Sequence, residues 1–492
     1  MIKYNKKEVF SALLFIFSPI IILLFHSVLT KRNDFFSLPL WSDEVNYWRE
    51  LYSFDENLFS MKGPIFFGLP AKIGGFSTHG LAPLFAWGWY AILFKWNLNS
   101  IIIANSIMIT FSFALFYFLV RPDYLKCVLL SMLTLFFAPL FCYIHSSMME
   151  IPCYAAIISY IAFFIFYTRK PSKIRFVLLI LSCFYVANLR IPYAILFIPA
   201  IFVFSDGRIN LKFLIAGFAF VFFTLLLYKV QGFFTSGYPF GLAAKLNAAS
   251  SYNEKIHLLI RNFYSNFKNL FSLKSEDFVQ VSQRYFYFVV MLVLFMQAVR
   301  ENNGKKVLYL ISSVYFQLLL LLLLLLLLLL LLSANCLLYD VFDWRDYRTM
   351  SPFLFGVLFF LINKDGDKII DGDFIVTVPL CALFMSFFIM LTIQPLKADR
   401  RTVRSFSKME TDISTIESAS LITVINDVPF DMKIVSLLSS KITWEGCYNL
   451  KDAINGKREL ILLNNDTDLM DNTEYGFILE IPNYGKVYRL KQ

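Results

Sequence analysis

Two adjacent acids, Asp43 and Glu44, stand in the aromatic stretch "LPLWSDEVNYWRELY" at residues 38–52. A carboxylate can act as a general base toward a hydroxyl or an amine. Adjacent residues of a helix point about 100° apart, so the two acids cannot serve one site equally. Asp43 and Tyr47, four residues apart, would share a face. The alternative is structural: Ser42 can cap a helix whose first turn favours acids.

Three arginines could bind phosphate, because a guanidinium offers a bidentate fork to a phosphate group. Arg190 lies in "NLRIP", and Arg345 and Arg348 lie in "YDVFDWRDYRTMSP". Each arginine could instead sit at the membrane interface and bind lipid headgroups.

The composition is that of a membrane protein. Of the 492 residues, 58% are hydrophobic, 56 are phenylalanine and only 16% are charged, whereas soluble domains are nearer to half apolar and a quarter charged. The first apolar run, Phe10–Leu29, has no small-residue cleavage site, so we interpret it as a retained anchor. The net charge of +10 is explained by cytoplasmic loops and requires no nucleic-acid partner.

Apolar runs predict an all-α polytopic membrane protein with about 11 transmembrane helices. They lie near residues 9–29, 101–120, 127–145, 151–168, 174–188, 190–204, 213–229, 285–299, 307–332, 350–363 and 374–393. The predicted span at residues 307–332 includes the leucine run Leu318–Leu332, which we interpret as a lipid-facing or core span.

The distribution of lysine and arginine predicts the orientation. Lys3, Lys6 and Lys7 keep the N-terminus in the cytoplasm, and alternation from there places the short basic loops, such as "TRKPSKIR", on the same side. The outer side then receives large loops at 30–100 and 230–284. Within the first loop, Leu81–Trp96 is expected to be a helix at the outer interface.

The chain divides into a membrane domain, residues 1–394, and a small extracytoplasmic α/β domain, residues 395–492. In the second part, "SLITVIND", "RELILLNN" and "YGFILEIPN" have strand length and end in turn residues. The seven cysteines are scattered without a CxxC motif, and no disulfide framework is expected.

In order along the chain, the polar motifs resemble those of the GT-C superfamily of polytopic glycosyltransferases. The similarity is to the branch of the protein O-mannosyltransferases and the lipid A aminoarabinose transferase. It rests on "DEVNYW" after the first span, "HGLAPL" at 79–84, "MEIP" at 149–152, "NLRIP" at 188–192 and "DYRTMSP" at 346–352. Proline does not directly follow His79, which departs from the family pattern.

The resemblance implies an inverting enzyme that takes a sugar from a polyprenyl-phosphate donor and transfers it on the outer face. It implies that Asp43 deprotonates the acceptor, with Glu44 as its partner or replacement. Arg190, with Arg345 or Arg348, would hold the donor phosphate. Tyr47, His79 and Glu150 would line the substrate pocket.

No metal or other cofactor is expected, because arginines can neutralise the phosphate. The acidic segments Asp365–Asp367 and Asp371–Asp373 could bind a metal ion, but they lie on the predicted cytoplasmic side of the membrane. Glu150 could also merely begin a helix, since acids and proline suit first turns.

The acceptor is expected to be a surface polysaccharide or a lipid-linked glycan, with a protein as a further candidate. The topology is also similar to that of O-antigen-modifying glucosyltransferases of lipopolysaccharide. We expect a bacterial inner membrane protein with a periplasmic C-terminal domain. Two alternatives stay open: a transporter or flippase, which would usually show buried charges or repeats, and a cell-envelope polysaccharide polymerase.

Overall fold

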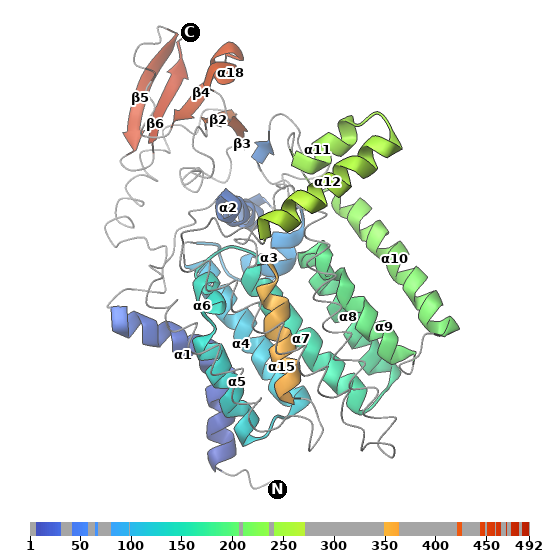
Figure 1. Cartoon of the computed structure of the whole chain (residues 1–492). Coiled ribbons are helices and arrows are strands. Elements are labelled where there is room, and N and C mark those ends of the chain that lie inside the picture. The colour runs from blue at the N-terminus through green and yellow to red at the C-terminus, as the bar shows by residue number, and fades with distance from the viewer. Residues whose placement is uncertain are drawn as a thin grey trace.

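The computed structural model describes a large part of the chain, in which helices predominate (Figure 1). The described residues are 6–30, 42–57, 64–66, 80–97, 99–205, 210–235, 241–270, 349–363, 421–425, 443–447, 450–457, 459–463, 469, 474–481 and 485–491.

A bundle of roughly parallel and antiparallel helices forms the larger body of the molecule (Figure 1). Its helices are α1 (Lys6–Thr30), α4 (Ser100–Val120), α5 (Tyr124–Phe136), α6 (Ala138–Ile144), α7 (Glu150–Arg169), α8 (Lys173–Leu189), α9 (Phe197–Phe204), α10 (Leu211–Gln231) and α15 (Ser351–Asn363). They occupy the apolar runs from which spans were predicted in this part of the sequence.

Four of these helices, α1, α4, α7 and α10, are long and apolar enough to cross a membrane. The apolar side chains of α10, among them Phe218 and Leu225, are mostly exposed, as expected of a helix that faces lipid. The chain is therefore consistent with a membrane protein. The predicted spans at 285–299, 307–332 and 374–393, with the leucine run, lie outside the described residues, so the total of about 11 stays a prediction.

Two of the predicted spans contain proline and are not single continuous α-helices. The span expected over 127–145 is two helices, α5 and α6, which meet at Phe137. Pro139 occupies the first turn of α6, where its missing N–H is tolerated, whereas inside one continuous helix it would break a hydrogen bond. The span expected over 190–204 likewise begins as a 3₁₀ helix, η2 (Ile191–Leu196), before α9.

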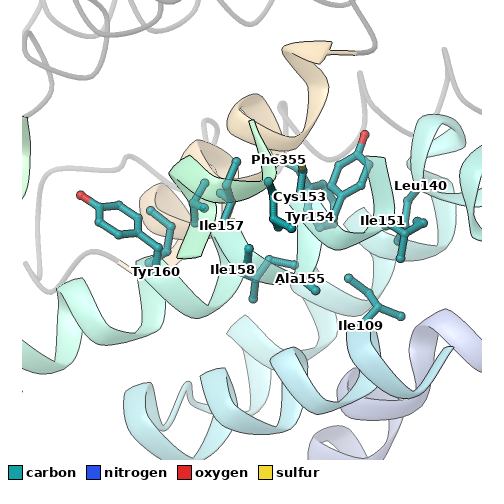
Figure 2. Close-up of a cluster of buried hydrophobic side chains, with 14 of the residues drawn as sticks. Ile109, Leu140, Ile151, Cys153, Tyr154, Ala155, Ile157, Ile158, Tyr160 and Phe355 are labelled. Carbon is teal, nitrogen blue, oxygen red and sulfur yellow. The ribbon is translucent and has the colours of Figure 1, made fainter. Parts of the chain in front are cut away.

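Helix α7 is the most deeply buried of the four long helices. Figure 2 shows its side chains surrounded by Ile109 from α4, Leu140 from α6 and Phe355 from α15. The helix packs so closely against α15 that a β-carbon at Gly356 would overlap Cγ2 of Ile157. A glycine at this position is therefore required by the helix contact. This packing fixes the direction in which the first turn of α7 presents its side chains.

Phenylalanine side chains hold α1, α4 and α15 together. The rings of Phe15 and Phe113 stack with centroids 5.0 Å apart, and Phe359 lies 5.4 Å from Phe113. All three side chains are fully buried. Aromatic pairs at these separations stabilise beyond their buried area, which explains part of the chain's unusual phenylalanine content.

A six-stranded sheet lies beyond one end of the bundle, next to α18 (Leu450–Asn455) (Figure 1). Its strands are β1 (Pro64–Phe66), β2 (Leu421–Ile425), β3 (Thr443–Cys447), β4 (Leu460–Leu463), β5 (Tyr475–Ile481) and β6 (Gly485–Leu490). Their order is β1-β3-β2-β4-β6-β5, in which the first four are parallel and β6 pairs antiparallel with both neighbours.

Three of these strands, β2, β4 and β5, fall in the three segments predicted as strands. However, β1 belongs to the loop that follows the first span, and it forms the edge of the sheet beside β3, with Ile65 opposite Glu445. The sheet is therefore not built from residues 395–492 alone. The predicted boundary at residue 395 lies outside the described residues.

Candidate active site

Asp43, Glu44 and Tyr47 lie on one helix, α2 (Ser42–Asn57), at the end of the bundle nearest the sheet (Figure 1). The two acids occupy its first turn, as the sequence predicted, where they favour the positive end of the helix dipole. Their surroundings nevertheless differ: Asp43 is half-buried, whereas Glu44 is only 3% exposed.

Helix α2 is fixed to the bundle near both of its ends. Ser146 Oγ donates a hydrogen bond to Glu44 Oε1, and Ser147 Oγ donates to the Glu44 carbonyl at 2.8 Å. Near the other end, Asp55 accepts from the backbone N–H of Trp96 at 2.9 Å. Glu44 therefore anchors the helix, and its neighbour Asp43 is left at the more accessible position.

Asn105 holds the turn that carries these two serines. Its amide nitrogen donates to the carbonyls of Ile144 and Ser146, at 3.1 and 2.9 Å, while its oxygen accepts from Trp87 Nε1 at 2.8 Å. This side chain is fully buried in α4. Asn105 was not among the residues predicted from the sequence, although an asparagine inside an apolar run is a recognisable signal of a polar contact.

Glu150 and Arg190 form an ion pair, with Arg190 Nη2 2.7 Å from Glu150 Oε1. The Glu150 side chain is fully buried, and that of Arg190 is 15% exposed. They meet because α7 begins at Glu150 where the antiparallel α8 ends, with Arg190 as its extended C-terminal cap. The structure thus brings together two residues predicted to serve the substrate pocket and the donor phosphate.

Tyr47 lies in the electrostatic field of the same groups. Burial, and then the negative charge of Asp43, raise the pKa of Tyr47 well above its usual range. Glu150 and Glu50 raise this pKa further, and Arg190 lowers it. The phenol therefore stays neutral at physiological pH and keeps its proton as a hydrogen-bond donor.

Two charged side chains of α2 that were not predicted as site residues are also fully buried. They are Arg49, whose guanidinium lies 5.6 Å from the ring centroid of Tyr52, and Glu50, one turn after Tyr47. The signal available in the sequence was "WRE", a charged pair enclosed by aromatic residues.

The start of α15 is held beside the ion pair by η2. Tyr193 donates its hydroxyl proton to the Thr349 carbonyl, and Tyr154 bonds Ser351 Oγ at 2.7 Å. Arg348, which precedes Thr349 in the chain, lies outside the described residues, as do Arg345 and His79. The roles predicted for these three residues stay predictions.

The described residues contain no group of three histidine, cysteine or acidic side chains that could hold a metal ion. What the site offers is a half-buried carboxylate, a neutral phenol and an arginine held by a buried glutamate. Such a set can accept a proton and bind an anionic group.

The chain matches no protein-family model, and no curated protein matches its sequence significantly. The resemblance to polytopic glycosyltransferases therefore rests on the sequence motifs alone.

Proposed function

We propose that this protein is an inverting glycosyltransferase that uses a polyprenyl-phosphate-linked sugar as donor. The acceptor is a hydroxyl or an amine of a surface polysaccharide or a lipid-linked glycan, and transfer takes place on the outer face of a bacterial inner membrane. In this arrangement the N-terminus is cytoplasmic, and the sheet is periplasmic.

One observation carries the proposal: side chains from α2, α7 and the end of α8 come together at one end of the bundle. These side chains were selected from three separate motifs: Asp43 and Tyr47 from the first, Glu150 from the second and Arg190 from the third. The charges of the other three residues act on the phenol of Tyr47. A lipid-linked donor and a polar acceptor can both reach the end of a membrane bundle, whereas a mid-membrane site would suit a transporter.

In the proposed reaction the acceptor oxygen or nitrogen forms a bond to the anomeric carbon of the sugar. Asp43 takes the acceptor proton, and the bond between the anomeric carbon and the phosphate oxygen breaks on the opposite face. The polyprenyl phosphate leaves with one more negative charge than it carried in the donor. Arg190 stabilises that charge, because a guanidinium remains charged and binds phosphate through two N–H groups.

Glu150 acts through Arg190 as a positioning residue. Its buried carboxylate holds one N–H group of the guanidinium at 2.7 Å, which restricts the directions in which the others point. Glu44 has the same kind of role for Asp43, because its contacts with Ser146 and Ser147 fix the start of α2.

The test compares Asp43→Asn with its neighbour Glu44→Gln, since both replacements exchange a carboxyl group for an amide at nearly constant volume. Strains lacking the protein would receive wild type or either variant at matched membrane levels, and mass spectrometry would examine their surface glycans and lipid A. We expect a sugar-sized mass with wild type. Asp43→Asn should reduce the modification about 10²- to 10⁴-fold, the usual effect of losing a general base.

Glu44→Gln should retain much of the modification, because an amide oxygen can still accept from Ser146. If Asp43→Asn restores the modification fully, Asp43 is not the base. A glycan profile that is unchanged in all strains would contradict glycosyl transfer itself.

A further inference from the structure

Helix α12 (Tyr252–Leu270) follows α10 and the short α11 (Gly241–Ala248) in the chain. Figure 1 shows it running across the direction of the bundle helices, close to the upper end of α10. The glycosyl-transfer proposal assigns it no role.

The side chains of α12 fall into three groups. With about 100° between successive residues, each group forms one face of the helix. One face is turned inward, since Asn266 is buried and Phe263 packs partly against the bundle core.

A second face is apolar and exposed. It consists of a row spaced mostly four residues apart, which places it along one side of the helix: Tyr252, Ile256, Ile260, Tyr264 and Phe267. Ile260 is 63% exposed and Tyr264 is 69% exposed. A row of this length is larger than the isolated apolar residues that are normal on a protein surface, and it indicates a surface that something apolar covers.

The third face is polar and mainly basic. Its exposed residues are Glu254, His257, Arg261, Ser265 and Lys268. Exposed Lys245 of α11 adds a further positive charge beside this helix. Apolar and basic faces on one helix are typical of helices that lie in the surface of a membrane with anionic lipids.

The exposed apolar side chains of α10 indicate where the membrane surface lies relative to the bundle. Its exposed apolar side chains continue to Val230, and the next residue, Gln231, is buried and donates from Nε2 to the Asn188 carbonyl at 3.2 Å. This contact ties the outer ends of α10 and α8 together. The apolar belt of α10 therefore ends at the upper end of this helix, and Figure 1 shows α12 close to that end.

We infer that α12 is an in-plane helix of the outer leaflet. Its apolar row lies among the acyl chains, and its basic face binds the phosphate groups of anionic lipids. Charge complementarity and continuity with the apolar surface of α10 favour a lipid surface over a second protein as the occupant. The choice of the outer leaflet rests on the orientation proposed above, whereas the in-plane position of α12 does not depend on the proposed reaction.

The test uses the full chain in nanodiscs of phosphatidylcholine and phosphatidylglycerol, with Ile260→Trp as reporter and Ser265→Trp as its matched control. Both positions are exposed on α12, but they lie on different faces. The signal of the seven native tryptophans would be subtracted with wild type. We expect added emission at Ile260→Trp to be blue-shifted, quenched by acyl-brominated lipid and insensitive to iodide. Ser265→Trp should show the reverse.

Equal quenching of both tryptophans by iodide would overturn the inference. Protection of Ile260→Trp from iodide without quenching by brominated lipid would also overturn it, because protein would then cover this face. In the reporter background, replacing Arg261 and Lys268 with glutamine should remove the dependence of bromine quenching on phosphatidylglycerol. A dependence that survives both replacements would contradict the assignment of the basic face. Elution of each variant as a single species would show that it is folded.

Discussion

The Glu150–Arg190 ion pair combines a fully buried carboxylate with a guanidinium that is 15% exposed. Removing one partner of a buried pair leaves a charge that has lost both water and its counter-ion, which usually costs more than the pair contributes. The effect of this pair on the free energy of unfolding can therefore be measured separately from its effect on glycosyl transfer.

We expect Glu150→Leu to lower the free energy of unfolding by roughly 3 kcal/mol, the lower end for buried pairs, because Arg190 keeps some contact with solvent. Adding Arg190→Leu should recover much of that loss, since the buried positive charge that has lost its carboxylate is then removed as well. The double variant should still lack glycosyl transfer. Thermal unfolding of the purified protein, together with the glycan measurement, checks both expectations. Equal loss of stability in the single and double variants would contradict the account.

Tyr47 makes the stability of the folded protein depend on pH in the alkaline range. Its pKa is raised by burial and by Asp43, so folding favours the neutral phenol. The resulting stability is present below the ordinary tyrosine pKa of about 10 and is lost as the pH rises toward the folded-state value.

Wild type should therefore lose more stability than Tyr47→Phe between about pH 9 and about pH 11, because phenylalanine has no proton to lose. The comparison needs only the melting temperatures of the two proteins across this range. Parallel pH profiles would show that the phenol does not ionise with a perturbed pKa.

At the level of helices, α15 reaches the site because it packs tightly on α7. Gly356 faces Ile157 at this crossing, with no room for a methyl group. By contrast, Gly217 lies on α10, where an added β-carbon would meet nothing within 4 Å.

Gly356→Ala is therefore expected to destabilise the protein by about 1–3 kcal/mol, the usual cost of overpacking. Gly217→Ala, the matched control, should be neutral or stabilise by up to about 1 kcal/mol, because alanine suits a helix better than glycine. Thermal unfolding of the two variants in the same detergent separates the cases. Similar effects at both positions would mean that helix propensity, and not the contact with Ile157, decides the outcome.

The helices of this chain could be predicted because each depends on a local pattern. Span length and apolarity identified α4, α7 and α10, and a capping serine followed by acids identified the start of α2. The contacts between them could not be predicted. The partners Ser146 and Glu44 are 102 residues apart, and the direction of each side chain depends on how the helices pack.

The members of the candidate site could be proposed from the sequence, but their arrangement could not. The motifs selected Asp43, Tyr47, Glu150 and Arg190, yet nothing local to Glu150 indicates that its partner is Arg190. Asn105 was missed because its hydrogen bonds serve a turn that only the folded bundle creates. The three-residue strand β1 was missed because its partner β3 lies near the other end of the chain.

Across the whole molecule, the pairing of β1 with β3 can be tested by cross-linking. Ile65 and Glu445 are partners in the parallel register, and neighbouring strands lie about 4.8 Å apart. Cysteines at these two positions of the full chain should form a disulfide under mild oxidation. Ile65→Cys with Gly485→Cys is the control, because β6 is separated from β1 by three strands. Comparable cross-linking of both pairs would contradict the strand order.

The same pairing restricts how the chain threads a bilayer. Two strands joined by backbone hydrogen bonds must lie in one aqueous compartment, so the chain between Phe66 and Leu421 crosses the membrane an even number of times. The ten spans predicted between residues 101 and 393 satisfy this parity. Merging two neighbouring spans into one, or counting the helix at Ala82–Leu93 as a crossing, would place the two strands of one sheet on opposite sides. A three-residue strand thus acts as a check on every assignment of topology to this chain.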